Sequence, residues 1–175
     1  MTPEDGKQFF PLGGDAVSRH ALNLDTGEIV SAETLAVDAG RTIPAPAICP
    51  ASLREAFTEA GYESSYDKDG DLLVDHPATN VNILVEARNK CIWFISAFTA
   101  NELVDMDVKY AFANRLNDRY HMVRFLFPTP TTFVADYVMS YKQGVVVTEL
   151  VAILERFAGT IAAALSENDD LDIIT

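Results

Sequence analysis

The stretch 81–98 constrains the fold of this chain more than any other. It holds two runs rich in β-branched and aromatic residues, 81–87 and 91–98, separated by Arg88-Asn89-Lys90, in which the Asn suits a tight turn. The first run alternates apolar and polar residues, as a strand with one solvated face does. The second run is apolar on both faces, so we expect a central strand that is covered on each side. The stretch therefore predicts an antiparallel hairpin at the centre of a sheet.

Three helices accompany this hairpin in a domain that begins near Pro50. Ser52 is a candidate N-cap for the first helix, which Gly61 ends. The sequence Thr99-Ala100-Asn101-Glu102 has the capping-box spacing that starts the second helix. Apolar residues at helical spacing mark the third helix, which begins near Thr148. The predicted helices cover 52–61, 99–118 and 148–165.

Strand pairs fill the intervals between the helices. The predicted strands cover 62–66, 71–74, 81–87, 91–98, 120–127 and 131–141. Asp69-Gly70 supplies the turn between the first two, which can also form one bent unit, so the strand number stays open by one. The predicted order is α-β-β-β-β-α-β-β-α. The fold class is therefore α+β, with an antiparallel sheet packed against three helices.

The two ends of the chain differ in composition from this domain. Residues 1–50 hold five of the eight prolines and five of the nine glycines, which break regular structure. Only 21–30 shows a hairpin pattern there, with Asp25-Thr26-Gly27 at its turn. We therefore divide the chain into a Pro/Gly-rich N-terminal arm (1–50), an α+β domain (51–166) and an acidic C-terminal tail (167–175).

The net charge of −13, from 26 acidic and 13 basic residues, excludes some partners. Such a charge repels nucleic-acid phosphates and anionic lipid surfaces, so we expect neither to bind. The charge serves solubility or favours a partner with a basic or amphipathic segment. The first residues do not resemble a signal peptide, and no apolar run is long enough to span a membrane, so we expect a cytoplasmic location.

Catalytic and metal-binding motifs are weak in this sequence. Asp67-Lys68-Asp69-Gly70-Asp71 resembles half of a calcium loop, but its flanks are strands and His76 stands where a bidentate Glu is needed, so we interpret it as a charged hairpin tip. The acidic residues near Glu102 suit a helix start. The histidines and cysteines match no metal-ligand spacing. We expect no catalytic residue, no metal and no cofactor. The histidines and cysteines that match no metal-ligand spacing are His20, His76, His121, Cys49 and Cys91.

The strands carry many aromatic residues, for which core packing is the default explanation. The alternative is that one sheet face or edge is exposed and binds a peptide or a second subunit. The second helix has an apolar stripe wider than one contact needs, so one of its neighbours can be another subunit. The candidate partner-binding surface combines that helix with the last strand, through Phe133, Tyr137, Tyr141, Met106 and Tyr110.

Residues 52–166 resemble a known family. The resemblance rests on packing and turn patterns in a fixed order, namely Glu59-Ala60-Gly61-Tyr62, Asp69-Gly70, Cys91-Ile92-Trp93-Phe94-Ile95, Asn114-Arg115-Leu116-Asn117 and Gln143-Gly144-Val145. In this order they are similar to the YbjN-type bacterial proteins, a family of sensory transduction regulators. The arm 1–50 and the residues 145–148 depart from the family pattern.

The resemblance implies a fold like that of type III secretion chaperones, a homodimer and no enzymatic reaction. Our first hypothesis is therefore a non-enzymatic, chaperone-like regulator that binds an unidentified protein, in bacterial sensory transduction or stress regulation. The second is a small-molecule- or metal-dependent enzyme that brings at least two of the histidines together with carboxylates. The third is a structural assembly protein whose N-terminal arm joins subunits.

Overall fold

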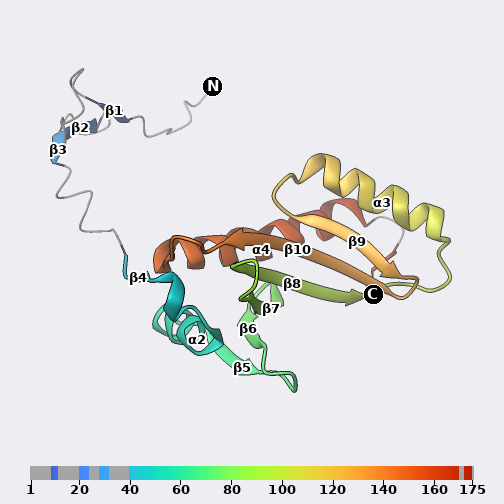
Figure 1. Ribbon diagram of the computed structural model, residues 1–175. Helices are drawn as coiled ribbons and strands as arrows, with labels where there is room; N and C mark the ends of the chain where they lie inside the picture. Colours follow the sequence, from blue (N-terminus) through green and yellow to red (C-terminus); the bar gives the residue numbers. More distant parts are fainter. Residues whose placement is uncertain (1–8, 12–19, 24–27, 32–39, 170–171, 175) are drawn as a thin grey trace. The chain divides into compact units, whose positions relative to one another are not determined.

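Figure 1 shows a computed structural model of the chain, which describes residues 9–11, 20–23, 28–31, 40–169 and 172–174. The chain forms two compact units, 1–41 and 42–175. The first unit contains a three-stranded antiparallel sheet of β1 (Phe9–Pro11), β2 (His20–Asn23) and β3 (Glu28–Ser31). The pairing of β2 with β3 confirms the predicted hairpin, although its turn lies outside the described residues.

The second unit is built on a six-stranded antiparallel sheet with the order β5-β6-β7-β8-β10-β9. Its strands are β5 (Glu63–Tyr66), β6 (Leu72–His76), β7 (Thr79–Glu86), β8 (Cys91–Thr99), β9 (Arg124–Thr129) and β10 (Thr132–Ser140). Its helices are α2 (Pro50–Glu59), α3 (Met106–Arg119) and α4 (Val147–Asn168). The α+β class and the order of these elements confirm the prediction.

The central hairpin forms as predicted, with β7 paired to β8 and β8 also paired to β10. The residue with positive φ in its turn is Lys90 (54°), next to the Asn expected there. Ile92 and Phe94 are fully buried, whereas Trp93 and Ile95 on the opposite face are only half-buried. The expectation that both faces of β8 are covered is therefore wrong. Hydrophobicity on two faces marks burial only when a second layer exists.

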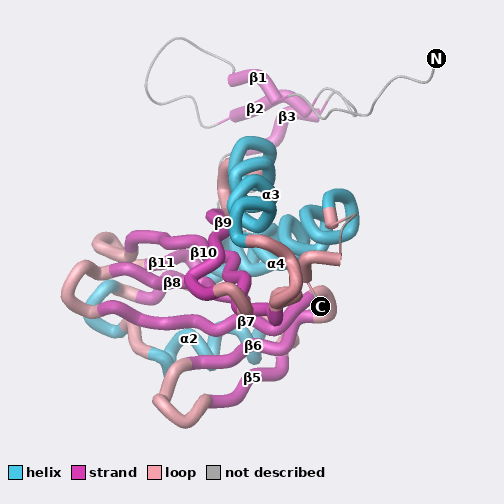
Figure 2. The backbone as a smooth tube through the Cα atoms, turned by 90° about the vertical axis from the view of Figure 1, so that its right-hand side faces the viewer, coloured by secondary structure: helices cyan, strands magenta, loops and turns pink. Residues whose placement is uncertain are grey.

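The helices of the second unit cover one face of the sheet, which we call the inner face (Figure 2). From α4, Phe157 lies 6.1 Å from Phe94 between ring centroids, and from α3, Phe112 lies 5.9 Å from Phe133. Complete burial of an aromatic or aliphatic side chain stabilises the fold by about 1.5–3 kcal/mol. The inner face therefore carries the core. The fully buried side chains of the helices include Leu53, Phe57, Leu116, Leu150, Leu154 and Phe157.

Two helix starts differ from the prediction. Helix α2 begins at Pro50, two residues before Ser52, because proline suits the first turn and Ser52 instead accepts a hydrogen bond from the Cys49 amide (3.1 Å). Helix α3 begins at Met106 rather than at Thr99. The predicted capping box does not form because β8 continues to Thr99 and pairs with Thr132.

A short two-stranded sheet connects the start of the second unit to α4. β4 (Thr42–Ile43) pairs with β11 (Val145–Val146), and Ile43 is buried in the core. Gly144 has a φ of +91°, and a Cβ atom there would lie 2.7 Å from the Ile43 carbonyl oxygen. Only glycine fits this approach. The residues 42–49, which we expected in the arm, therefore belong to the compact second unit.

The C-terminal residues that the structure describes pack against the sheet. Helix α4 ends at Asn168, and Asp169 then accepts a hydrogen bond from the amide of Ile173 (2.7 Å). Ile173 is buried, and its carbonyl accepts a hydrogen bond from the Asn101 amide (2.8 Å). The segment predicted as an acidic tail thus contributes an apolar side chain to the core. No described helix is long and apolar enough to cross a membrane.

Candidate functional site

The face of the sheet opposite the helices, which we call the outer face, presents an apolar strip. Strand register places Leu84 and Val138 on either side of Trp93, across β7, β8 and β10. Ile95 follows Trp93 on the same face two residues later, since side chains alternate along a strand. Val138 is 39% exposed and the other three are half-buried. Among the described residues no helix covers this strip.

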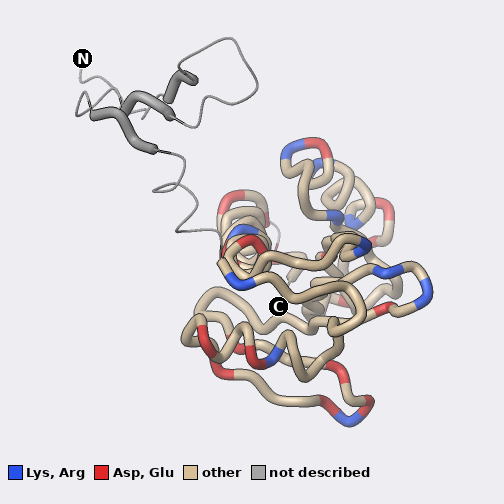
Figure 3. Tube along the Cα trace, turned by 60° about the vertical axis from the view of Figure 1, so that its left-hand side comes forward, with Lys and Arg blue, Asp and Glu red and all other residues tan. Residues whose placement is uncertain are grey.

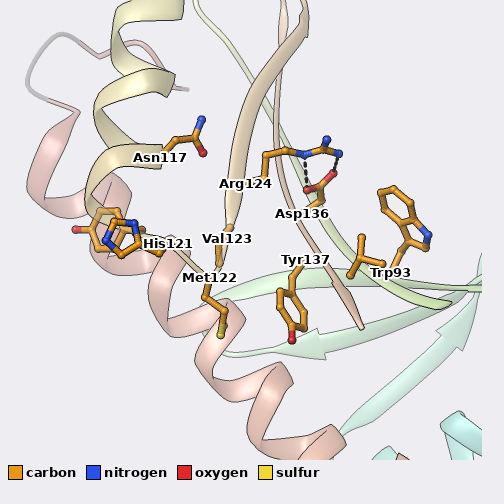
Figure 4. Close-up of a pocket in the computed structure, with 10 residues that line it drawn as sticks. Trp93, Asn117, His121, Met122, Val123, Arg124, Asp136 and Tyr137 are labelled. Carbon is orange, nitrogen blue, oxygen red and sulfur yellow. Dashed lines mark hydrogen bonds and ion pairs between the residues drawn. The ribbon is translucent and has the colours of Figure 1, made fainter. Parts of the chain in front are cut away.

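A groove of about 450 Å³ opens on one side of Trp93 (Figure 4). Its lining comes from β8, from β10, from the end of α3, from the start of β9 and from the segment that connects α3 to β9. In Figure 4, Met122 and Tyr137 lie toward α4, whereas Trp93 lies beyond Arg124 and Asp136. The groove therefore joins the outer face to the end of the helical layer. The lining residues that the argument uses are Trp93, Met122, Arg124, Asp136, Tyr137 and Val138.

An ion pair stands at the centre of this groove. Arg124 donates to both carboxylate oxygens of Asp136, at 2.9 Å from Nε and 2.5 Å from the second guanidinium nitrogen. This bond raises the pKa of the Arg124 guanidinium, first through the hydrogen bonds and then through the charge of Asp136. The Asp136 side chain is 8% exposed and that of Arg124 is 60% exposed. The pair therefore satisfies a buried carboxylate without covering the groove.

One side chain holds the connecting segment in place. The Asn117 side chain donates to the Phe125 carbonyl (2.9 Å) and accepts from the Phe125 amide (2.8 Å), so it replaces a missing strand partner at this point. Because these bonds tie the end of α3 to the start of β9, the connection 120–123 runs as a wall of the groove. The connection pairs with no strand among the described residues.

A second hollow of about 280 Å³ lies on the other side of Trp93. It is lined by Asp71, Leu84, Val85, Glu86, Trp93 and Ile95. Burial raises the pKa of the Asp71 carboxyl, and the nearby charges of Asp67 and Asp69 add to this effect. The two hollows flank the same indole ring. Trp93 is therefore the one described residue that lines both hollows.

The structure separates the five residues that we predicted as a partner-binding surface. Phe133 is fully buried and Tyr141 is 4% exposed, so neither is available to a partner. Phe133 lies on the face of β10 that packs against the helices, and Tyr141, which directly follows β10, is buried in the same core, which explains this correction. Tyr137 lines the groove, whereas Met106 and Tyr110 lie in the first half of α3, away from the groove at its other end. For these three, partner binding stays a prediction.

Sequence reasoning missed the outer face of β8 and the Arg124–Asp136 pair. One signal was available, since the strands predicted at 120–127 and 131–141 differ in length. Unequal paired strands leave part of the longer one without a neighbour. The observed strands of 6 and 9 residues differ in length by the same amount, although β9 begins only at Arg124. The ion pair has no local sequence signal, as its two residues stand twelve apart.

The histidines do not converge on one site. His76 contacts Glu155 (3.2 Å), and its other ring nitrogen accepts from the Ala78 amide (3.1 Å). Tyr62 also donates to Glu155, and its ring stacks on that of His76 at 5.9 Å. His121 lines the groove instead, and the side chain of His20 lies outside the described residues. Within the described ranges, no three His, Cys, Asp or Glu side chains form a metal-binding group.

The hairpin tip considered as half a calcium loop is a turn. The Asp67 carboxylate accepts hydrogen bonds from the amides of Asp69 and Asp71, both at 2.9 Å, so its oxygen is occupied by the backbone. Asp67, Lys68 and Asp69 alternate in charge at the tip of the β5–β6 hairpin, at the bottom of Figure 3. These contacts agree with our interpretation of a charged hairpin tip.

Comparison with known proteins identifies the family of the region that forms the sheet and its helices. Residues 50–167 match the sequence profile of YbjN, a family described as "Putative bacterial sensory transduction regulator". The chain belongs to the YbjN family. The matched region contains α2, the six-stranded sheet, α3 and nearly all of α4, so the YbjN match confirms the resemblance seen in the sequence. The search of curated proteins found no match.

Two solved structures share the YbjN fold with this chain. The crystal structure of E. coli YbjN, described as a "putative transcription regulator", has a TM-score of 0.62 and 13% identity, over 73% of this chain and 96% of that one. The crystal structure of an uncharacterized protein from Methanothermobacter thermautotrophicus has a TM-score of 0.53 and 12% identity, over 70% and 97%. At these identities the likeness establishes the fold.

Proposed function

We propose that this YbjN-family protein is a non-enzymatic, chaperone-like regulator that acts by binding another protein through its outer face. The observation that carries the proposal is the uncovered apolar strip of Leu84, Trp93, Ile95 and Val138, flanked by two hollows. Large aromatic side chains beside pockets supply most of the binding energy in protein interfaces. A regulatory role is the role described for the family.

The surroundings of Trp93 favour protein binding over chemistry. The two oppositely charged side chains of the groove are already engaged, because Arg124 and Asp136 neutralise each other. A reaction would need a group poised to exchange a proton with a substrate. A partner side chain needs only the apolar surface and the space beside it.

The experiment compares partner capture by the full-length protein and two groove variants. Trp93→Ala removes the shared aromatic ring, and Val138→Asp puts a charge into the apolar strip. We expect each variant to recover at least tenfold less of the partner that wild type captures from the native cell. The captured protein is then purified, and its affinity for each variant is measured by calorimetry.

Tyr66→Ala is the matched control for this experiment. Tyr66 is 43% exposed on β5 at the far edge of the sheet, where Arg54 lies over its ring at 5.2 Å. Its loss removes an exposed aromatic ring without touching the groove, so partner binding should be unchanged. Equal binding by wild type, Trp93→Ala and Val138→Asp would reject the outer face as the binding surface.

We also propose that the protein is a homodimer, as expected from the sequence. The support is the exposed apolar surface at the start of α3, where Leu103, Val108 and Tyr110 are 88%, 39% and 51% exposed. Light scattering measures the mass in solution. Tyr110→Asp should convert a dimer into a monomer, and a monomeric wild type would reject the proposal.

A further inference from the structure

The edge of β10 beside the groove has a row of backbone groups without a strand partner. β9 pairs with β10 only from Thr132 to Asp136, whereas β10 continues to Ser140. Residues 137–140 therefore have β8 on one side and no described strand on the other. At about 3.3 Å per residue, this open edge is roughly 13 Å long.

The register identifies which groups point outward. The Tyr141 amide donates to the Lys90 carbonyl and the Ala100 amide donates to the Thr131 carbonyl, both at 2.9 Å. These bonds show that odd-numbered residues of this strand direct their amides and carbonyls toward β8. Since successive residues alternate, Val138 and Ser140 direct theirs toward the open side. An unprotected edge of this kind is a template for one more strand.

The groove lies where an added strand would run. Its lining includes Tyr137 and Val138 of the open edge, together with Trp93 and Met122. The connection 120–123 turns away from β10 toward α3, and so leaves space along the line of β9 (Figure 4). Alternate side chains of an incoming strand would meet the Trp93 ring on one face and the Tyr137 ring on the other.

The charge at the far end of this edge is opposite to that of the whole protein. Two residues beyond Ser140, Lys142 lines a hollow of about 430 Å³ with Arg88, Asn89 and Lys90. Three of the chain's 13 lysines and arginines therefore meet at this point, in a protein of net charge −13. None of the described residues that line this hollow carries a carboxylate. Glu86 of the same hairpin accepts a hydrogen bond from Asn89 (2.5 Å) and lines the hollow beyond Trp93.

We propose that the open edge of β10 binds an extended segment of the partner protein as an additional strand, with acidic residues at the segment's end beside Lys142. The segment's backbone would pair with Val138 and Ser140, and its carboxylates would contact Arg88, Lys90 and Lys142. This inference rests on the proposed function, since it specifies the partner segment that the outer face receives. The net charge of −13 favours a basic partner segment, whereas the cationic hollow around Lys142 favours an acidic one, so the two predict opposite preferences.

The test uses two fluorescein-labelled ten-residue peptides and the full-length protein. In both peptides threonine and valine alternate, and the first three residues are glutamates in one and lysines in the other. An added strand that is antiparallel to β10, as β9 is, places its first residues beside Lys142. Fluorescence polarisation measures binding at low salt. We expect the glutamate peptide to bind at least tenfold more tightly. Double reversal of the hollow, Lys90→Glu with Lys142→Glu, should reverse this preference, whereas Lys68→Glu at the β5–β6 hairpin tip should leave it unchanged.

Amide hydrogen exchange then tests the strand itself. In the free protein the amides of Val138 and Ser140 should exchange quickly, while those of Tyr137 and Met139 are protected by β8. The glutamate peptide should slow exchange at Val138 and Ser140 at least tenfold and leave Tyr137 and Met139 unchanged. The odd-numbered amides are thus an internal control within one strand.

Several results would overturn the inference. A preference for the lysine peptide, no preference, or no added protection at Val138 and Ser140 each rejects an acidic added strand. Protection of both amides in the free protein shows that a second copy or the arm already fills the edge. If a captured partner depends on Trp93 but not on Lys90 and Lys142, the proposed function stands and this inference fails.

Discussion

The two faces of one sheet carry similar side chains and serve different purposes. Phe94 and Trp93 are neighbours on β8, yet Phe94 is fully buried against Phe157 of α4, while Trp93 is half-buried between two hollows. The inner face is filled by three helices. The outer face has none among the described residues, so its apolar side chains remain available for binding.

The presence of an aromatic residue in a strand therefore does not by itself show whether the residue packs in the core or faces a partner. Phe133 and Tyr141, which we expected to bind a partner, are in the core, and Trp93 faces outward. Whether an aromatic side chain is buried or exposed depends on which face of the sheet the helices cover. Apolar side chains that stay exposed on one face of a sheet are typical of a surface that binds another molecule.

The largest expected effect contrasts the two neighbours directly. Phe94→Ala should lower the free energy of unfolding by about 3–5 kcal/mol, because it opens a cavity in a closed core. Trp93→Ala should cost about 1 kcal/mol, since its ring is half-exposed and water fills the space it leaves. Urea unfolding followed by circular dichroism measures both. Similar losses in the two variants would contradict the distinction between the faces.

The second prediction concerns Asp136, a buried charged residue on the outer face. Arg124→Met should destabilise the fold by about 2 kcal/mol, because the Asp136 carboxylate is 8% exposed and would lose its ion pair with Arg124. Arg124→Met with Asp136→Leu should recover most of this loss, since no buried carboxylate then remains. Urea unfolding of the single and double variants forms the test. A double variant less stable than Arg124→Met would refute this explanation.

The third prediction concerns the rim of the inner face, where α4 meets β6. The pKa of Glu155 is lowered mainly by its hydrogen bond with Tyr62 and then by its hydrogen bond with His76. The pKa of Tyr62 is raised to about 12, mainly by burial and then by the hydrogen bond and charge of Glu155. Glu155 therefore contributes stability that is present above its ordinary pKa and is lost as pH falls through the lowered value. Tyr62 contributes stability that is present below its ordinary pKa of 10 and is lost as pH rises toward 12.

Glu155→Gln should remove the acid dependence and weaken the alkaline one, because burial, the larger cause of the raised pKa of Tyr62, remains. Its cost at pH 7 should be about 1 kcal/mol, because the Glu155 side chain is 57% exposed and solvent screens its interactions. Melting temperatures measured from pH 3 to pH 11 should show flatter acid and alkaline limbs for the variant. Exposed Glu63→Gln serves as a control, and an equal flattening in that variant would remove the role assigned to Glu155.

The smallest effect is spectroscopic. Trp93 is the only tryptophan in the chain, so intrinsic fluorescence reports on the outer face alone. Binding of a partner or of the glutamate peptide should shift its emission to the blue and reduce quenching by acrylamide, because the half-exposed ring becomes covered. Val138→Asp should abolish the shift. Binding without any change in emission would place the contact elsewhere.

Much of the fold was predictable from local patterns. The order of helices and strands, the central hairpin and the hairpin at 21–30 all follow from periodicity and turn residues, which act over a few neighbouring positions. The helix starts were less accurate. At Thr99 a local cap competes with continued pairing of β8, and the long-range hydrogen bonds of the sheet prevail.

The candidate site was less predictable than the fold. Tyr137 was identified, but Trp93, Arg124 and Asp136 were missed, and Phe133 and Tyr141 were assigned to a partner-binding surface although both are buried. Alternation along β10 placed Phe133, Tyr137 and Tyr141 on one face correctly. For β10 the pattern also favours this face as the buried one, because the opposite face carries Thr132, Asp136 and Ser140. Only β8, which is apolar on both faces, leaves the side of the helices open.

The sequence by itself determined the elements, their order and the YbjN family of this chain, because these depend on spacing along the backbone. Only the tertiary structure decided which face of the sheet is closed and where β9 stops beside β10. These features come from contacts between residues far apart in the chain, such as Phe94 with Phe157 and Asn117 with Phe125. The open edge and the outer face, and with them the proposed function, are consequences of that packing.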